Sequence, residues 1–393
     1  MQGDGEAITP RPPTGEGDTD RVLLAINAGS SSVKCALFTD SVQPSILHRA
    51  SLEGSGGDSV TPLLAWIDAH TPRTAIAAIG HRLVHGGPTY TEPQVISGDV
   101  RDELTRLVPF APNHLPAEMT FIDALGAHVP GVPQVACFDT AFHRTMPEVA
   151  RRLAIPAEYH RRGIQRYGFH GLSYSFLLEE LARVSGSAGA GGRVILAHLG
   201  HGSSLAAVRD GISIDTTMGL TPLGGVVMST RAGDLDPGVV TYIARTDRLS
   251  ADRVEEILSH RSGLLALSGT TADMRQLLTR QRDDASARFA VHGYVYSIVK
   301  AIGAFAAVLG GVDTLVFSGG IGEHAAPVRE RICEALGFLG VSLDASANNA
   351  HARIISAAAS RITVRVLPTN EELMIARATY RVVARDKSHA GNH

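Results

Sequence analysis

Short apolar runs that end in glycine, serine or acidic residues recur along this chain. Residues 21–26 (RVLLAI) run into the polar turn NAGSSS, and the apolar pattern resumes over residues 33–38. Runs of this length bounded by turn residues are typical of buried strands. The pattern predicts a helix over residues 373–383 and further strands at residues 74–79, 135–138, 193–197, 205–208, 314–317 and 362–367. Strands interspersed with helices indicate an α/β fold.

The first strand–turn–strand unit has a counterpart in the middle of the chain. VLLAINAGSSSVKCALF resembles VILAHLGHGSSLAAVRDG, and Gly29 aligns with Gly202, 173 residues later. Similarity at this distance suggests a duplicated domain. A chain of 393 residues also exceeds the size of a single core, so two domains are expected. The Gly- and Ser-rich residues 185–192 (SGSAGAGG) are interpreted as a flexible link near the start of the second half.

Composition narrows the class of protein. The net charge of −3 argues against nucleic acid or an anionic membrane as the main partner. Cys35, Cys137 and Cys333 are scattered and odd in number, which gives neither a disulfide framework nor a metal pattern and fits a reducing cytoplasm. Residues 1–20 are rich in Gly, Pro and acid, lack the features of a signal peptide and are interpreted as a disordered extension.

The chain contains one long apolar stretch. Residues 285–309 are interrupted by Arg288, His292 and Lys300, which favours a buried or interfacial helix over a membrane span.

Three glycine-bearing strand ends carry the candidate chemistry. They are the turns GSSS at Gly29, GHGSS at Gly200 and GGIGE at Gly319. Consecutive backbone N–H groups in such turns bind anions, and hydroxyl groups add donors. A plain hairpin would explain one of these turns, but two matched turns with a third Gly-rich loop suit a nucleotide held between two domains. No P-loop, dinucleotide fingerprint, nucleophile elbow or HExxH motif is present.

Eight motifs now identify a resemblance. In chain order they are NAGSSSVK, GHRLVHGG, CFDTAFH, RYGFHGLSY, HLGHGSS, TRAGDLDPG, GGIGE and PTNEEL. Over about residues 21–385 the chain resembles the acetate/propionate kinase family, within the superfamily that includes actin and hexokinase. The resemblance implies duplicated actin-like (RNase H-like) α/β domains with the active site in the cleft between them. It implies an N-terminal domain over residues 21–150, completed by a helix at 371–388, and a C-terminal domain over 151–370 that binds nucleotide and forms a homodimer.

The implied activity is reversible, Mg²⁺-dependent transfer of the ATP γ-phosphoryl group to acetate, giving acetyl phosphate and ADP by a direct in-line reaction. Mn²⁺ could replace Mg²⁺. A propionate or other short-chain carboxylate kinase is the alternative enzyme, and a non-catalytic nucleotide-sensing protein is the alternative of a different class.

The resemblance also implies roles for individual side chains. Arg82 and Arg231 would grip the carboxylate and the transferring phosphoryl group, for which a planar guanidinium is well suited. His170 would donate to the phosphoryl group, and His114 matches a second active-site histidine. A carboxylate acceptor needs no general base, so Asp139 is assigned to Mg²⁺ and to positioning.

Asn27 and Glu371 are the predicted metal-site residues, held partly through water as Mg²⁺ prefers. Glu371 has a structural alternative, because acids are common in the first turn of a helix. Ser30 and Ser32 are candidate phosphate or metal-water contacts. Lys34 could reach phosphate or be a solvated strand residue.

The nucleotide site is predicted from residues in both halves of the chain. Its members are Lys34, His198, Gly200, His201, Gly202, Asp273, Met274, Arg275, Gly320, Ile321, Gly322 and Glu323. The small residues near Gly320 leave room for adenosine and favour ATP over pyrophosphate.

The substrate site is predicted to combine Arg82 with a methyl pocket of Val84, Asn113, Phe169 and Pro222. Two positions depart from the family pattern: His201 stands where Asn is usual, and Asn113 where an apolar residue is usual. The choice between acetate and propionate stays open, because one methylene is worth only about 1–3 kcal/mol.

Overall fold

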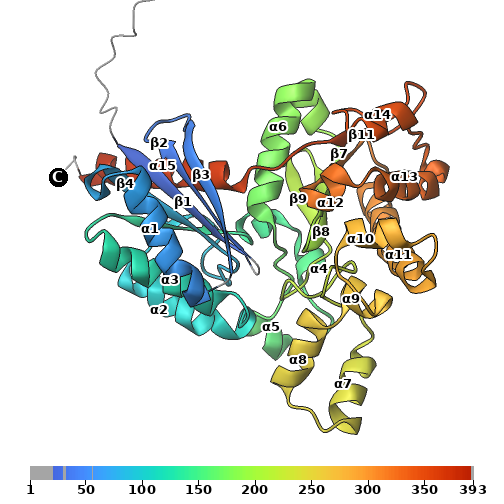
Figure 1. Cartoon of the computed structure of the whole chain (residues 1–393), viewed down its shortest axis with the longest axis horizontal. Coiled ribbons are helices and arrows are strands. Elements are labelled where there is room, and N and C mark those ends of the chain that lie inside the picture. Colours follow the sequence, from blue (N-terminus) through green and yellow to red (C-terminus); the bar gives the residue numbers. More distant parts are fainter. Residues whose placement is uncertain (1–20, 30–31, 55, 391–393) are drawn as a thin grey trace, which may run out of the picture.

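Two β-sheets lie side by side in the structure, a computed structural model that describes residues 21–29, 32–54 and 56–390 (Figure 1). The first sheet has the order β3-β2-β1-β4-β6-β5 and the second the order β11-β10-β7-β8-β9. The strands of the first sheet are β1 (Val22–Ala28), β2 (Ser32–Thr39), β3 (Ile46–Glu53), β4 (Ile76–Leu83), β5 (Gln94–Val95) and β6 (Gln134–Phe138). Those of the second are β7 (Arg193–Leu199), β8 (Ser203–Arg209), β9 (Ile212–Thr216), β10 (Thr314–Ser318) and β11 (Thr363–Val366).

Both sheets repeat one topology. In the first, β1, β2 and β3 are antiparallel neighbours, and β4 and then β6 continue in parallel from β1. In the second, β7, β8 and β9 are antiparallel, and β10 and then β11 continue in parallel from β7. The β1–β2 and β7–β8 hairpins therefore occupy equivalent places, and the predicted α/β fold with an internal duplication is confirmed.

Helices cover both faces of the first sheet. Leu63 of α1 (Val60–His70) and Phe121 of α3 (Leu115–His128) pack on one face. Ile375 of α15 (Glu371–Ala390) packs on the other, so this late segment returns to the first sheet. The predicted domain boundaries at residues 150 and 370 stay predictions.

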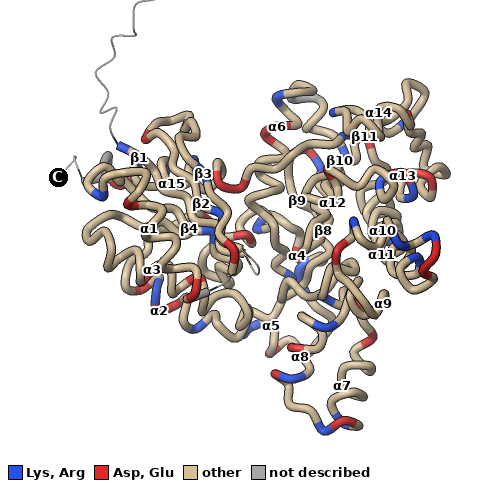
Figure 2. Tube along the Cα trace, in the orientation of Figure 1, with Lys and Arg blue, Asp and Glu red and all other residues tan. Residues whose placement is uncertain are grey.

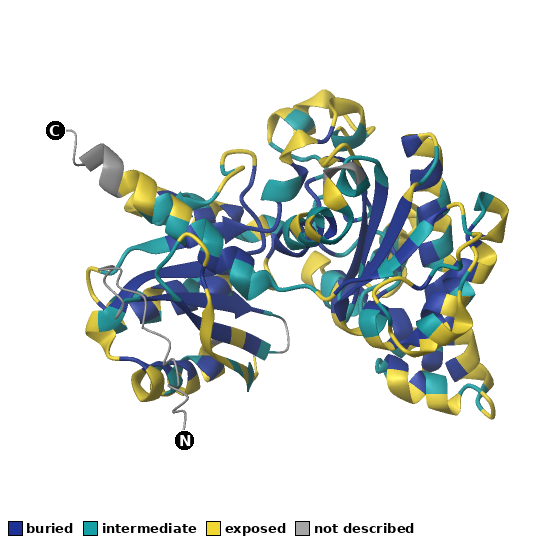
Figure 3. Cartoon of the chain, turned by 90° about the horizontal axis from the view of Figure 1, so that it is seen from above, coloured by how far each residue is buried: buried dark blue, intermediate teal, exposed yellow. Residues whose placement is uncertain are grey.

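The second sheet is enclosed in the same way. Tyr294 of α11 (Ala285–Leu309) packs on one face and Leu177 of α6 (Gly171–Ala190) on the other. The central strands of both sheets appear as buried layers in Figure 3, whereas most of the edge strand β3 is exposed. The remaining helices are α2 (Gly98–Leu107), α4 (Glu148–Arg151), α5 (Ala157–Arg161), α7 (Pro237–Thr246), α8 (Ala251–His260), α9 (Gly263–Ser268), α10 (Met274–Arg280), α12 (Gly319–His324), α13 (Ala326–Ala335) and α14 (Ala345–Asn349).

Helix α11 is, within the described ranges, the one helix long and apolar enough to cross a membrane by length and composition. One face of it lies in the second core, whereas Phe289 and Tyr296 are exposed. The position agrees with the predicted buried or interfacial helix. Asp284 caps its first turn, and Gly310 ends it in the left-handed conformation.

Two expectations need correction. The predicted flexible link at residues 185–192 is wrong, because α6 continues through Ala190 with a kink at Gly186, where φ is 73°. The backbone is not helical at Gly186 itself, and Ala190, after this interruption, packs against the core of the second sheet. The strand predicted from residue 74 begins at Ile76, after a short 3₁₀ turn. The predicted extension at 1–20 and Ser30 lie outside the described residues.

Candidate active site

A cavity of about 440 Å³, here called the central cavity, lies where the two hairpin turns face each other. Side chains from both halves of the chain line it. Most of the predicted catalytic, substrate and metal residues meet there, together with part of the nucleotide set: Asn27, Lys34, Arg82, Val84, His114, Phe169, His170, His198, Gly200, His201, Gly202, Pro222, Arg231, Gly320, Glu323 and Glu371. Ser32 lines it as well.

Arg82 reaches this cavity from the end of β4 and is held by Asp139 at the end of β6. Asp139 is fully buried, and its Oδ2 accepts hydrogen bonds from Arg82 Nε at 3.0 Å and Nη2 at 2.6 Å. Burial by itself would lower the pKa of Arg82. The Asp139 and Glu371 carboxylates outweigh this effect, so the pKa of Arg82 is raised. Arg82 is therefore a fixed positive charge, and Asp139 lies directly behind it.

The predicted metal residues form one hydrogen-bonded group beside Arg82. Asn27 Nδ2 donates to Glu371 Oε2 at 2.8 Å and to Glu372 Oε1 at 3.0 Å. Burial raises the pKa of Glu371, which the charge of Arg82 opposes. Glu372 was missed by the sequence analysis, although it is the second acid of the PTNEEL motif.

Oxygen donors of this kind suit Mg²⁺. Asp139 Oδ1 is buried and has no hydrogen-bond partner, so one carboxylate oxygen is left over for a cation or its water. The parts of the chain that the structure describes contain no cluster of three or more His, Cys, Asp or Glu side chains able to hold a metal by themselves. Mg²⁺ is usually held by one or two carboxylates together with water and substrate phosphates.

His170 and Arg231 converge on the second hairpin turn. A Cβ atom at Gly202 would lie 3.4 Å from His170 Nε2 and 3.5 Å from Arg231 Nη1, so both side chains lie in van der Waals reach of this turn. His170 has a φ of 60°, which is uncommon for a residue other than glycine. Arg231 Nη1 also donates to the Pro222 carbonyl at 3.0 Å, which fixes the direction of the guanidinium.

Burial governs the charge of these groups. Burial and the charge of Arg82 lower the pKa of Arg231 to about 10, which leaves it positive at neutral pH. Burial, reinforced by Arg231 and Arg82, lowers the pKa of His114 to about 3. Burial and the neighbouring His198 hold the pKa of His170 well below its usual value. The imidazoles therefore act as neutral hydrogen-bonding groups between two permanent cations.

A second cavity of about 760 Å³, the outer cavity, adjoins the central one and shares Gly200, His201 and Gly320 with it. The other predicted nucleotide residues that line it are Asp273, Met274, Arg275 and Ile321. The GGIGE segment is the six-residue helix α12 and its N-terminal turn rather than an open loop, and Glu323 Oε1 accepts from the Gly319 N–H at 2.9 Å. Gly322 lines neither cavity and is a buried residue of this helix.

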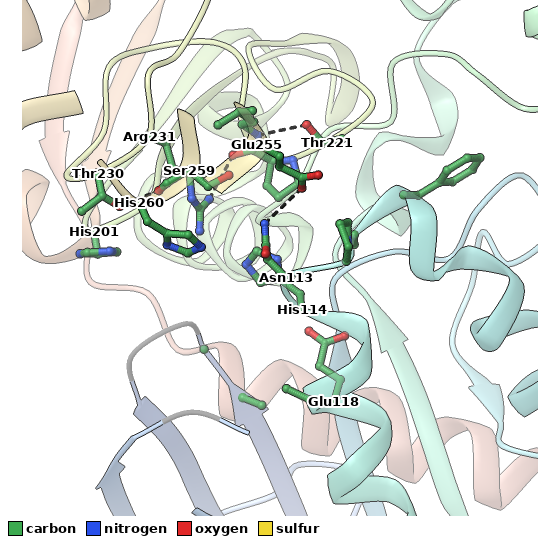
Figure 4. Close-up of a pocket in the computed structure, with 18 residues that line it drawn as sticks. Asn113, His114, Glu118, His201, Thr221, Thr230, Arg231, Glu255, Ser259 and His260 are labelled. Atoms are coloured by element: carbon green, nitrogen blue, oxygen red, sulfur yellow. Dashed lines mark hydrogen bonds between the residues drawn. The ribbon is translucent and has the colours of Figure 1, made fainter. Parts of the chain in front are cut away.

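A third cavity of about 400 Å³, the Asn113 cavity, shares His114, Pro222 and Arg231 with the central cavity, and Figure 4 shows the residues that line it. Asn113 is exposed there, and its Nδ2 donates to Glu255 Oε1 of α8 at 3.1 Å, which joins the two halves. Asn113 does not line the central cavity with Val84, Phe169 and Pro222.

Glu118 of α3 also lines the Asn113 cavity and was missed by the sequence analysis. Its Oε2 accepts from the Val84 N–H at 3.0 Å, whereas the buried Oε1 has no partner. Burial raises the pKa of Glu118 to about 8, so the carboxyl group is mainly neutral at pH 7. A lone Glu early in a helix gives no sequence signal of such a position.

Known proteins resemble this chain over most of its length. The profile of the acetokinase family matches residues 57–377. An acetate kinase of Rhodopseudomonas palustris is 42% identical over 92% of this chain and 98% of its own length. One from Streptomyces coelicolor is 48% identical over 81% of this chain and 78% of its own length.

Solved structures agree with the sequence relatives. The crystal structure of Porphyromonas gingivalis acetate kinase matches with a TM-score of 0.80 and 34% identity, over 92% of this chain and all of the other. That of a Francisella tularensis propionate kinase matches with a TM-score of 0.83 and 35% identity over the same shares. These neighbours confirm the actin-like form of the duplicated fold. The chain belongs to the acetokinase family.

Proposed function

We propose that this protein is an acetate kinase, which reversibly transfers the γ-phosphoryl group of ATP to acetate and forms acetyl phosphate and ADP. The observation that carries the proposal is the meeting of Arg82, Arg231 and His170 with two glycine-rich turns in one cavity. Phosphoryl transfer depends on positioning and charge stabilisation, and this cavity supplies both.

In the proposed mechanism, Arg82 and Arg231 bind the acetate carboxylate and neutralise charge on the equatorial oxygens. Asp139 holds the Arg82 guanidinium through two hydrogen bonds, so that the fork is already oriented when substrate arrives. Acetate is ionised at neutral pH, so its oxygen attacks without a general base. The reaction is direct and in line, with no stable phosphoenzyme.

His170 donates a hydrogen bond to the transferring phosphoryl group, and His114 supports the same region as a neutral imidazole. The N–H groups around Gly200 and Gly202 bind phosphate oxygens, with Lys34 and His198 at the edge of the same cavity. A neutral donor gives up no proton during transfer, which suits a reaction that runs in both directions.

Asn27, Glu371 and Asp139 would hold Mg²⁺ or, in its place, Mn²⁺, with part of the coordination through water. Bound there, the ion would neutralise charge on the nucleotide phosphates. Asn27 keeps the Glu371 carboxylate oriented toward the cavity through its amide.

The nucleotide proposal is ATP rather than pyrophosphate. The outer cavity, with Asp273, Met274, Arg275 and Ile321 on its walls, is large enough for adenosine and continues into the phosphate-facing turn. His201 stands at the junction of all three cavities and would contact the phosphates from an exposed position.

We further propose a cytoplasmic homodimer that binds neither nucleic acid nor membrane. Basic and acidic residues are interspersed over both halves of the trace, which supports the absence of a polyanionic partner (Figure 2).

A propionate kinase is the second candidate, supported by the likeness to a solved propionate kinase. Val84, Phe169 and Pro222 form the proposed methyl pocket, with Asn113 outside it on the rim of the neighbouring cavity.

The deciding experiment traps acyl phosphate with hydroxylamine. Acetate, propionate, butyrate and glycolate are each supplied with ATP or with pyrophosphate in the presence of Mg²⁺. We expect hydroxamate with acetate and ATP, and less with longer acids. No product with any acid would refute the kinase proposal and favour a nucleotide-sensing protein, whereas a higher rate with propionate would reassign the substrate.

A further inference from the structure

Two stacked imidazoles face the second hairpin turn. The rings of His170 and His198 lie 4.3 Å apart, with an angle of 26° between their planes. A Cβ atom at Gly202 would lie 3.4 Å from His170 Nε2, and one at Gly200 would lie 3.7 Å from His198 Nε2. Both Nε2 atoms therefore point at the turn that is proposed to bind phosphate.

The opposite nitrogen of each ring meets a buried serine. His170 Nδ1 lies 2.8 Å from Ser204 Oγ, and His198 Nδ1 lies 2.8 Å from Ser173 Oγ. Both serines are 0% exposed. The position of each imidazole proton therefore depends on which way these serine hydroxyl groups donate.

The direction of donation at His170 follows from Tyr174. Its hydroxyl lies 2.5 Å from Ser204 Oγ, which among the described residues is the only acceptor for the tyrosine proton. Burial raises the pKa of Tyr174, so its hydroxyl keeps the proton, and the His198 backbone, which opposes that rise as a hydrogen-bond donor does, is not an acceptor for it. A buried O–H without an acceptor is unfavourable, so Tyr174 donates to Ser204. Ser204 then has one proton, and His170 Nδ1 is its acceptor.

A buried serine fixes the proton of His198 in the same way. Its Nδ1 is, in the described part of the chain, the only partner of the buried Ser173 hydroxyl group. Ser173 therefore donates to it.

We infer that Tyr174, Ser204 and Ser173 are positioning residues that fix His170 and His198 in the tautomer with the proton on Nε2, so that two parallel N–H donors face the transferring phosphate. None of the three touches the substrate. The use of these donors rests on the proposed function, but the tautomers are a property of the free protein and can be measured without any reaction.

The test reads the proton positions directly. Protein labelled with ¹⁵N in its histidine side chains is examined by NMR, and His170 and His198 are assigned from the signals lost in His170→Asn and His198→Asn. We expect a protonated Nε2 and an unprotonated Nδ1 at both residues in the free protein. A protonated Nδ1 at His170 would overturn the inference, and loss of kinase activity alone would not produce that result.

Variants connect the tautomer to the reaction. In Ser204→Ala we expect a mixture of tautomers at His170 and a fall in kcat of about 10- to 100-fold, with KM for ATP and acetate within about threefold. Tyr174→Phe should give a smaller change in the same direction, because Ser204 keeps its proton but loses its orientation. An unchanged tautomer in folded Ser204→Ala, or a changed tautomer with unchanged kcat, would contradict the assigned role.

The chain offers a matched control. Ser203 and Tyr294 are equally buried, and their hydroxyl oxygens are 2.9 Å apart, but they contact neither imidazole. Ser203→Ala and Tyr294→Phe should leave the ¹⁵N signals of both histidines unchanged. If Ser204→Ala does not fold, the wild-type spectrum and Tyr174→Phe still decide the question.

Discussion

At the scale of single residues, the site separates groups that keep their charge from groups that lose it. Arg82 and Arg231 stay positive, whereas burial holds His114, His170 and Glu118 neutral at pH 7. Hydrogen bonds from neutral groups and charge from fixed guanidinium groups are then supplied by different side chains. Substitutions can test the two contributions separately.

Arg231→Ala should lower kcat by about 10²–10³-fold, because it removes a preoriented cation from the site of charge development. Steady-state rates with acetate and ATP measure this, and a thermal melt checks the fold. Arg231→Lys should recover only part of the rate, since lysine keeps the charge but loses the planar fork. Arg245→Ala, at an exposed position of α7, is the control. Near-normal turnover in Arg231→Ala would show that Arg231 has no role in the mechanism.

Glu118→Gln should change the pH dependence of stability. Burial raises the folded-state pKa of Glu118 from 4.5 to about 8, so between these values the native carboxyl keeps a proton that the unfolded chain releases. This contribution is favourable below pH 4.5 and is lost as pH rises toward 8. Glutamine cannot ionise, so the variant should gain about 1–4 kcal/mol relative to wild type between pH 5 and 8.

Urea unfolding at several pH values measures that gain. Glu158→Gln, at an exposed position, serves as the control. Parallel pH profiles for wild type and Glu118→Gln would show that Glu118 is ionised in the folded protein.

At the scale of elements, the local sequence pattern predicted the strands of the sheets well. It predicted the packing between segments that are distant in the sequence less well. The glycine-bearing ends of β1, β7 and β10 could be located because short apolar runs and turn residues are local signals. The helical residues that follow the interruption at Gly186 could not, because the packing of Ala190 on the second sheet is not a local signal. Glu118 and the Tyr174–Ser204 pair escaped prediction for the same reason, since burial and a partner 30 residues away give them their roles.

Gly80→Ala should loosen α15 from the first sheet. A Cβ atom on Gly80 of β4 would lie 2.1 Å from Thr379 Oγ1 and 2.5 Å from Ile375 Cγ2, both on α15. The cost should be about 1–3 kcal/mol of stability. Because α15 begins with Glu371, the KM for Mg²⁺ should rise as well. Thermal melts and Mg²⁺ titrations of activity measure both effects.

Gly98→Ala is the matched control, because a Cβ atom there meets nothing within 4 Å. A wild-type melting temperature in Gly80→Ala would show that α15 does not pack tightly at this point.

At the scale of the whole molecule, the site depends on two halves that approach each other across the cavities. The Asn113–Glu255 hydrogen bond joins them at the rim, while Arg82 and Arg231 face the central cavity from opposite halves. The relative position of the two sheets therefore sets the distance between the two cations.

Asn113→Leu should leave the acetate-to-propionate ratio of kcat/KM within about threefold of wild type, because Asn113 lies outside the pocket of Val84 and Phe169. Val84→Ala, which enlarges that pocket, should shift the ratio toward propionate by about tenfold. Competition assays with both acids measure the ratio. A large shift of this ratio in Asn113→Leu would show that the Asn113 side chain belongs to the methyl pocket.

The return of α15 to the first sheet has a consequence for how the protein is made. β4 ends at Leu83, and α15 begins at Glu371. A ribosome that adds about 5–20 residues per second needs roughly 15–60 s to cover that interval. Throughout this time one apolar face of the first sheet lacks its own helix, and the site lacks Glu371. Nascent chains therefore expose apolar surface that a chaperone could recognise. They gain activity only when their last helix docks.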